Sequence, residues 1–245
     1  MSQSGTRQFL SSTLCAYPTK GKASAVPTSG SKQFYCFNVR AYNNSGSAIN
    51  VGILQLLSKP QWNLYDYTAL STSYTNVTAS IQSGSSTQIF STTNNDGFLV
   101  SASYQFGMIG MTVSTSGASG VYTYKYWNGT SFTTLTTLEV PAYSSTADIW
   151  VVFQPPADWV AGGGPNASQF AILIQGTTAP ANTVNINNMW LGRFLELYEA
   201  VPNNAVVQLS FPDSKPLLLE GGCGVIPYFA TAAAANQVAT FYALA

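Results

Sequence analysis

Short segments in which apolar and polar side chains alternate recur along this sequence, and this pattern constrains its fold more than any other feature. Residues 98–106 (FLVSASYQF) place large side chains at every second position, with mostly Ser and Gln between them. Residues 121–127 (VYTYKYW) repeat the alternation with tyrosines. A two-residue period is typical of half-buried β-strands. No long amphipathic helix is visible, so the chain is restricted to β-sheets.

Other segments carry a weaker strand signal of the same kind. They are residues 34–40, 49–57, 149–153, 170–174, 183–187, 190–200, 205–211 and 237–244. Residues 190–200 (WLGRFLELYEA) fit a helical face equally well, so a helix stays an alternative there. About ten strands separated by polar turns predict an all-β fold, a jelly-roll-like antiparallel β-sandwich. We expect residues 33–245 to form a single domain, and residues 1–32, rich in Ser, Thr, Gly, Lys and Pro, to form an extended N-terminal arm.

Four residues mark the strongest hairpin signal in the chain: Tyr126, Trp127, Asn128 and Gly129. An Asn-Gly pair supplies the positive φ angles of a type I′ turn, which matches the twist of two paired strands. The segment SFTTLTTLEV would return as the second strand. We expect the aromatic rings to pair across the strands and to fill a core. The alternative is an exposed row of rings that serves as a contact surface.

Charged residues are few, at 7%, and they are unevenly distributed. Residues 1–65 contain six basic residues and no acid, a charge of +6, whereas the remainder has three basic and nine acidic residues, a charge of −6. Sampling noise in so short a list is one interpretation. The other is that the arm, with Arg7, Lys20, Lys22 and Lys32, docks on an acidic surface, such as that of a neighbouring copy. Six dilute charges do not indicate a specific nucleic-acid partner.

The absence of histidine excludes many catalytic and metal sites. Neither a Ser-His-Asp triad nor a histidine-liganded zinc site can form, and three scattered cysteines do not make one. Two carboxylates suffice for glycoside hydrolysis. The default candidates are Asp66, Asp96, Glu139, Asp148 and Asp158, and each is better explained as a turn or strand-end residue. We therefore expect a protein that is not an enzyme, with no catalytic residues, no metal site and no cofactor.

A cluster of aromatic residues lies in the stretch QWNLYDYTALSTSYTN, which is rich in Thr and Asn. Trp62, Tyr65 and Tyr67, with Tyr74 nearby, would form a platform in a loop. Rings beside amide groups are suited to stacking on sugars, so a glycan is one candidate partner. A subunit interface is the other, because Tyr and Trp are enriched in interfaces.

Part of the chain resembles β-sandwich domains of tailed-bacteriophage particle proteins. The resemblance covers residues 121–176, where an aromatic strand ends at an Asn-Gly turn and a Phe-x-x-Pro-x-Asp-Trp segment follows. The matching residues are Tyr126, Trp127, Asn128, Gly129, Phe153, Pro156, Asp158 and Trp159. Separately, VNINNMWLGRFLELYEA is similar to the late strand of many jelly rolls, including carbohydrate-binding modules.

The resemblance implies a structural protein of a virus particle. We expect a head decoration or cement protein that binds the major capsid protein and other copies of itself. The alternatives are a tail or baseplate component, a carbohydrate-binding jelly-roll module and a jelly-roll coat protein. No apolar run approaches the 18 residues of a membrane span. The start of the chain lacks the apolar region of a signal peptide, and the cysteines are odd in number. We therefore expect a virion location after synthesis in the host cytoplasm.

Overall fold

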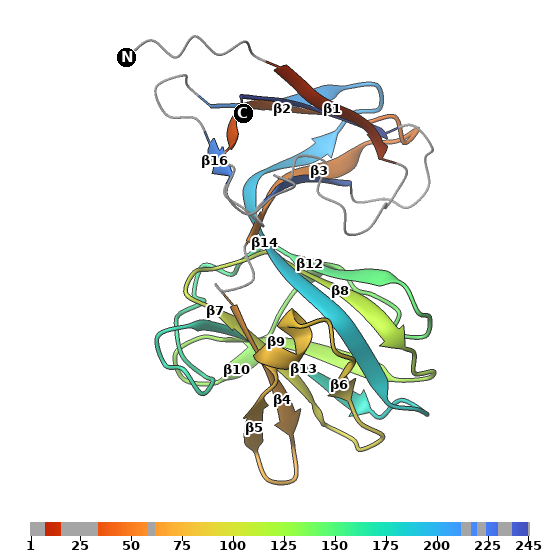
Figure 1. The fold of residues 1–245 in the computed structure, drawn as a ribbon, viewed down its shortest axis with the longest axis vertical. Helices are drawn as coiled ribbons and strands as arrows, with labels where there is room; N and C mark the ends of the chain where they lie inside the picture. Colours follow the sequence, from red (N-terminus) through yellow and green to blue (C-terminus); the bar gives the residue numbers. More distant parts are fainter. Residues whose placement is uncertain are drawn as a thin grey trace. The chain divides into compact units, whose positions relative to one another are not determined.

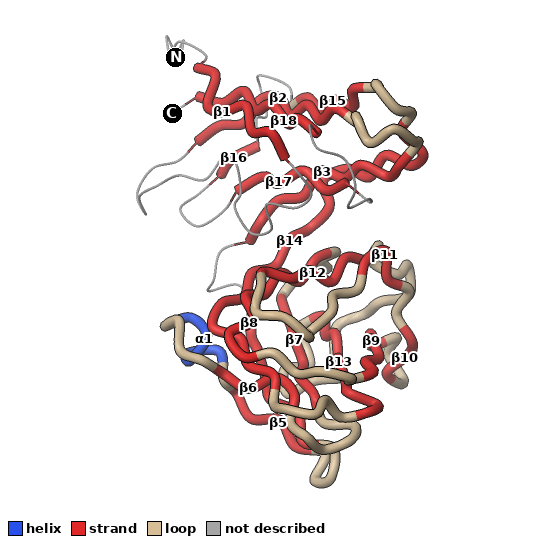
Figure 2. The backbone as a smooth tube through the Cα atoms, turned by 90° about the vertical axis from the view of Figure 1, so that its right-hand side faces the viewer, coloured by secondary structure: helices blue, strands red, loops and turns tan. Residues whose placement is uncertain are grey.

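Across the residues that the structure describes, the fold is almost entirely β-structure, with one short helix, α1 (Thr78–Gln82) (Figures 1 and 2). The computed structural model describes residues 8–15, 34–57, 62–211, 217–219, 224–229 and 237–244. Its sheets are antiparallel and pack together, so the prediction of an all-β, antiparallel sandwich is confirmed.

The chain divides into two compact units. The first unit consists of Met1–Ser58 and Gly192–Ala245, and the second, here called the jelly-roll unit, is Lys59–Leu191. In sequence, the jelly-roll unit is therefore an insertion into the first unit. The single domain predicted for residues 33–245 spans parts of both units and stays a prediction.

The jelly-roll unit is named for its strand order. Its strands are β4 (Trp62–Thr68), β5 (Ser73–Asn76), β6 (Thr87–Phe90), β7 (Gly97–Ala102), β8 (Met108–Thr115), β9 (Val121–Trp127), β10 (Phe132–Thr134), β11 (Thr137–Glu139), β12 (Asp148–Phe153), β13 (Phe170–Thr178) and the first part of β14 (Val184–Val201). One sheet, the β13 sheet, has the order β10-β9-β13-β7-β4-β5. The other, the β8 sheet, has the order β11-β12-β8-β14, with β6 also paired to β14.

Eight of these strands, β6, β7, β8, β9, β10, β12, β13 and β14, follow one another in the pattern of a jelly roll. The β8 sheet contains the first, eighth, third and sixth of them, and the β13 sheet contains the second, seventh, fourth and fifth. Such interleaving of two four-stranded sheets is the arrangement of a double Greek key. The β4–β5 hairpin extends the β13 sheet, and β11 extends the β8 sheet.

The core of the jelly-roll unit is filled by aromatic rings. Among its largest fully buried side chains are Trp62, Phe90, Phe98, Phe106, Tyr143, Phe153 and Trp159. The Trp159 ring lies 5.1 Å from Phe106 and 5.6 Å from Phe170 in edge-to-face geometry. Pairs of this kind stabilise a core by about 0.5–1.5 kcal/mol beyond the burial of their area.

The first unit is built from β1 (Gln8–Cys15), β2 (Phe34–Tyr42), β3 (Ile49–Leu57), the last part of β14, β15 (Val206–Ser210), β16 (Leu217–Leu219), β17 (Gly224–Phe229) and β18 (Gln237–Leu244). Its larger sheet has the order β1-β18-β2-β15, with β16 also paired to β2. Strand β3 pairs with β14 and β17. Part of the predicted arm is thus a strand at the edge of a sheet, since β1 pairs with β18.

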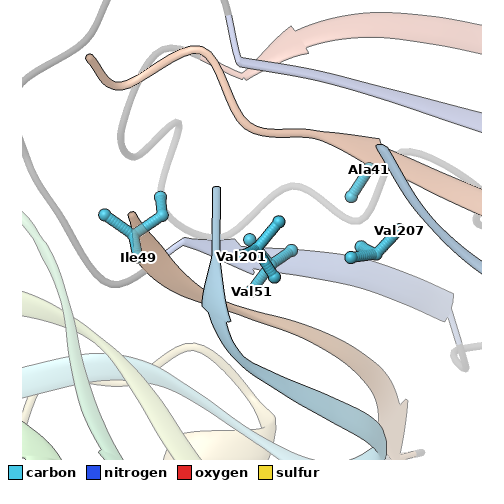
Figure 3. Packing of buried hydrophobic residues seen from close by; sticks show 5 residues of the cluster. All are labelled: Ala41, Ile49, Val51, Val201 and Val207. Atoms are coloured by element: carbon cyan, nitrogen blue, oxygen red, sulfur yellow. The ribbon is translucent and has the colours of Figure 1, made fainter. Parts of the chain in front are cut away.

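Small aliphatic side chains form a core cluster in the first unit (Figure 3). The buried members are Ala41, Ile49, Val51, Val201 and Val207. They come from β2, β3, β14 and β15, so four strands contribute to one small cluster.

A fully buried amide, Asn43, ties two loops of the first unit together. Its Nδ2 donates to the backbone oxygens of Ser47 (2.9 Å), Val201 (2.8 Å) and Pro202 (3.0 Å). Its Oδ1 accepts from the backbone N–H of Ser45 at 3.0 Å. Buried polar groups are costly unless they are hydrogen-bonded, and this side chain satisfies its own groups and those of both loops.

Some sequence-based expectations are confirmed and others need correction. The strands predicted at residues 183–187 and 190–200 are confirmed and are joined in one continuous strand, β14, so the helical alternative for residues 190–200 is wrong. The stretch expected to be a platform loop is the β4–β5 hairpin. The strand predicted at residues 98–106 ends at Ala102 and is buried on both faces, not half-buried.

Candidate functional site

The rings of the predicted hairpin belong to the core. Tyr124 and Tyr126 are only 8% and 7% exposed, and they lie on the side of β9 that faces the sandwich interior. The Tyr126 hydroxyl donates to Asp158 Oδ1 at 2.8 Å, and this hydrogen bond raises the pKa of Tyr126. Burial raises the pKa of Tyr124 to about 12. These tyrosines support the interpretation of the hairpin as a core element and not as an exposed row.

The turn of this hairpin differs from the predicted type I′ turn. Trp127 pairs with Phe132, so the loop has the four residues 128–131. A type I′ turn needs positive φ at both central residues, but only Gly129 has it, at 101°. Asn128 Oδ1 instead accepts from the N–H of Thr130 (3.0 Å) and of Ser131 (2.9 Å). The asparagine acts through its side chain, which mimics a backbone turn.

The predicted aromatic platform is mostly buried. Trp62 is 1% exposed and Tyr65 is 8% exposed. Tyr67 is half-buried and pairs with Tyr74, with 5.1 Å between the ring centroids. Trp62 lies on one face of β4, whereas Tyr65 and Tyr67 lie on the other, because side chains alternate along a strand. The structure therefore does not bring the three rings together on one exposed surface.

The predicted arm contacts Arg7, Lys20, Lys22 and Lys32 lie outside the described residues. Their docking on a capsid stays a prediction.

The outer face of the β13 sheet is covered by the chain's own glycine loop. Gly162 and Gly163 have φ angles of 127° and 77°, and a Cβ on either would lie within 3 Å of the Trp127 indole. A Cβ on Gly164 would lie 3.1 Å from Leu99 Cδ2. Only glycine permits this close approach with these backbone angles. The segment GGGP (residues 162–165) is therefore packed against the sheet.

Hydrogen bonds fix the same cover at its far end. Gln169 Oε1 accepts from Asn63 Nδ2 at 3.0 Å and from Ser101 Oγ at 2.7 Å. Asn63 and Ser101 are direct partners on β4 and β7, so they share the outer face. The part of this face around Trp127, Leu99 and Ser101 is therefore occupied by the protein itself.

The outer face of the β8 sheet is different, because it holds an open depression. Six residues line the depression: Gln82, Ser83, Gly84, Thr112, Asn187 and Asn188. The first three follow from the end of α1, Thr112 comes from β8, and the two asparagines come from β14. Its volume is about 440 Å³. This volume lies within the range of about 300–1,000 Å³ found for small-molecule sites, but the depression is open, so a ligand there would stay largely exposed to solvent.

The alternation of buried and exposed positions shifts by one residue within β14, and this places both Asn187 and Asn188 on the outer face. Val184 and Ile186 are buried, and so are Met189 and Leu191, which shifts the buried positions by one residue between the pairs. A β-bulge produces such a shift and redirects side chains. The sequence carries a signal of this shift in the Asn187-Asn188 pair, which interrupts the alternation of apolar and polar residues.

Two indoles lie next to the depression on the same sheet. Trp150 and Gly110 are direct cross-strand partners, as are Asp148 and Thr112 one step along the strands. The Trp190 indole lies over Gly110, where any Cβ would overlap it. Trp150 and Trp190 pack edge to face, with 6.3 Å between their centroids.

Four charged side chains of the jelly-roll unit, those of Asp96, Lys125, Asp148 and Asp158, form hydrogen bonds with neutral groups. Residues 59–191 contain two basic and five acidic residues. The internal partners are Ala69 N–H (2.8 Å) and Ser91 (2.6 Å) for Asp96, Thr112 (2.7 Å) for Asp148, Tyr126 (2.8 Å) for Asp158 and Gln175 (2.8 Å) for Lys125. Burial, and secondarily the charge of Asp96, raises the pKa of Asp66. This unit therefore has few charged groups to present at its surface.

One large apolar side chain is presented to solvent by an ordered turn. Leu70 is 94% exposed at the tip of the β4–β5 hairpin. The turn is held by the bond from Ala69 to Asp96 and by a hydrogen bond from Thr72 N–H to the Ala69 oxygen, 3.3 Å. Thr72 has a φ of 47°, an uncommon angle for a β-branched residue.

Known chemistry offers few further candidates. Among the described residues, no three His, Cys, Asp or Glu side chains are grouped so that they could hold a metal ion. In the same part of the chain, no helix has the length and apolar character to cross a membrane. No family model, curated protein or solved structure matches this chain.

Proposed function

We propose that this protein is a non-enzymatic structural component of a virus particle, a decoration or cement protein that binds the capsid and other copies of itself. The phage-like segment at residues 121–176 and the jelly-roll strand order support this role. The observation that carries it is the low number of charged residues in the jelly-roll unit, seven in 133 residues, four of which (Asp96, Lys125, Asp148 and Asp158) are hydrogen-bonded within the unit.

An uncharged surface suits a permanent contact for a physical reason. Exposed ion pairs contribute little to binding and are screened by salt. Contacts made by hydroxyl, amide and apolar groups do not depend on ionic strength in this way. Proteins with little charge also tend to associate rather than stay apart.

The test is the number of copies in purified particles of the encoding virus, measured by quantitative mass spectrometry and located by electron microscopy. We expect tens to hundreds of copies on the head, retained after a wash in 1 M NaCl. Copies confined to the tail or baseplate would replace the decoration role with the rival one. A copy number that accounts for all the subunits of the shell would identify a coat protein. Absence from particles would overturn the proposal.

The chain offers a variant that maps the contact. Leu70→Asp places a charge at the tip of the β4–β5 hairpin, where an apolar contact would be lost. Val206→Asp is the matched control, because Val206 is also exposed, at 57%, but belongs to the first unit. If the hairpin docks on the capsid, Leu70→Asp lowers occupancy about tenfold or more, whereas the control stays near the wild-type level. Equal occupancy for both variants would remove the hairpin from the contact.

A further inference from the structure

The depression on the β8 sheet has a lining that selects one class of ligand. Its five side chains are three primary amides and two hydroxyls, and Gly84 completes the wall. Amides and hydroxyls both donate and accept hydrogen bonds. Within the described residues, the side chains of Asn187 and Asn188 have no hydrogen-bond partner. Their donors and acceptors are available to a ligand.

The charge of the surroundings excludes anionic ligands. No lysine or arginine lines the depression, so nothing there would neutralise a phosphate or sulfate group. The nearest described charge is negative, because the Asp148 carboxylate accepts from Thr112 at 2.7 Å. No apolar side chain lines the depression either, which disfavours lipid tails and apolar peptide side chains.

The Trp190 indole beside the depression offers an apolar contact surface. Trp190 is two residues from Asn188 on β14 and is partly exposed. It lies over Gly110, which is two residues from Thr112 on β8. The ring is thus one step along both strands from the amide-lined depression. Indoles pack favourably on apolar C–H surfaces through dispersion, and a sugar ring has such a face opposite its hydroxyl groups.

From this combination we infer that the depression is a binding site for a neutral saccharide. The amides of Asn187 and Asn188 bond its hydroxyls, and Trp190 contacts its C–H face. The site is distinct from the Trp62, Tyr65 and Tyr67 platform expected from the sequence. It does not rest on the proposed function, since a glycan on a cell or on a particle would present the same chemistry.

The experiment uses the full chain and a panel of defined oligosaccharides. The neutral probes are oligosaccharides of glucose, galactose and N-acetylglucosamine, and the acidic probes are sialylated and sulfated oligosaccharides. Saturation-transfer NMR detects binding, and amide chemical shifts of isotope-labelled protein locate it. We expect at least one neutral probe to bind and to shift the backbone amides of Gln82, Thr112 and Asn188.

Variants with a matched control complete the test. Asn187→Ala and Asn188→Ala are each expected to weaken binding about tenfold, as the loss of hydrogen bonds to a bound polar ligand would. Gln88→Ala removes an exposed amide from β6 of the same sheet, outside the depression, and is expected to change affinity less than twofold.

Three results would overturn the inference: no probe binds, only acidic probes bind, or the shifts map away from the depression. The shifts are measured on the wild type, so a folding defect in a variant does not leave the inference untested.

Discussion

The two units of this protein solve the problem of core formation with different side chains. The jelly-roll unit buries large aromatic rings, among them Trp159 and Phe153, in edge-to-face contacts. The first unit has a described cluster of Ala, Ile and Val side chains and a buried amide, Asn43. Large rings remove more apolar area from water per residue and add specific ring contacts. A truncation should therefore cost more in the jelly-roll unit.

A feature of the sequence allows the two units to be followed separately. All five tryptophans lie between residues 62 and 190, within the jelly-roll unit. Tryptophan fluorescence therefore reports that unit alone, whereas far-UV circular dichroism reports both. Coincident unfolding curves would support the single domain predicted for residues 33–245, and separate curves would show two cooperative units.

The largest effect is expected for Trp159→Ala. Its ring is 2% exposed and is surrounded by Phe106, Phe153 and Phe170. Truncation leaves a large cavity, so we expect a loss of about 3–5 kcal/mol in the free energy of unfolding. Urea titration followed by fluorescence of the four remaining tryptophans measures it. Trp159→Phe keeps a ring and should lose less than half as much. A loss under about 1 kcal/mol for Trp159→Ala would contradict the aromatic core.

A smaller effect is expected for Val51→Ala in the first unit. Val51 is fully buried against Val201 and its neighbours (Figure 3). Removing two methyl groups should cost about 1.5–2.5 kcal/mol. If the units unfold separately, the circular-dichroism curve shifts and the fluorescence curve does not. Val206→Ala, at an exposed position, is the control and should change stability little. Equal shifts in both probes would show that the two units unfold together.

The alternation of residues along the strands made the fold class predictable, but it could not show which faces the protein covers. Leu99 and Ser101 are buried because a loop more than sixty residues later in the chain closes over them. The segment 98–106 has the pattern of a half-buried strand, and nothing within it indicates this distant cover. The burial of Trp62 was hidden in the sequence in a similar way. The segment around it is half polar, and taken alone it looks like a surface loop.

The candidate site in the depression was even harder to predict from the sequence than the cover over the β13 sheet. Its lining combines residues from α1, β8 and β14, which the strand order of the jelly roll brings together. The Asn187–Asn188 interruption was the one local signal. Similarly, Asn128–Gly129 predicted a hairpin at the correct place, whereas the turn type depended on the Asn128 side chain, which selects a four-residue loop.

The buried amide of the first unit provides a polar counterpart to these core truncations. Asn43→Ala removes the donor to three backbone oxygens and the acceptor for Ser45. Buried groups that lose their partners should cost about 1–2 kcal/mol, measured by the circular-dichroism transition. Asn43→Asp is the informative companion, because it would set a carboxylate against the same oxygens. It should be worse than Asn43→Ala at pH 7 and should recover on acidification. The opposite order would mean that the amide is not the source of the stability.

The smallest effect is expected at Asp66 in the jelly-roll unit, and its sign is unusual for a carboxylate. Burial, and then the charge of Asp96, raises the folded-state pKa of Asp66 above its ordinary value of 3.8. Between these two pKa values the folded state binds more protons than the unfolded state, so this group makes stability fall as pH rises through that window. At neutral pH the charged form is a net cost, limited by solvent screening to under about 1 kcal/mol because the group is half exposed. Asp66→Asn should therefore raise the urea midpoint slightly at pH 7 and make the fluorescence-detected stability less dependent on pH in the acidic range. Asp148→Asn is the control. The Asp148 carboxylate accepts a hydrogen bond from Thr112, whereas Asp66 has no bond from that residue. A lower midpoint for Asp66→Asn at pH 7 would show that the Asp66 carboxylate stabilises the folded jelly-roll unit.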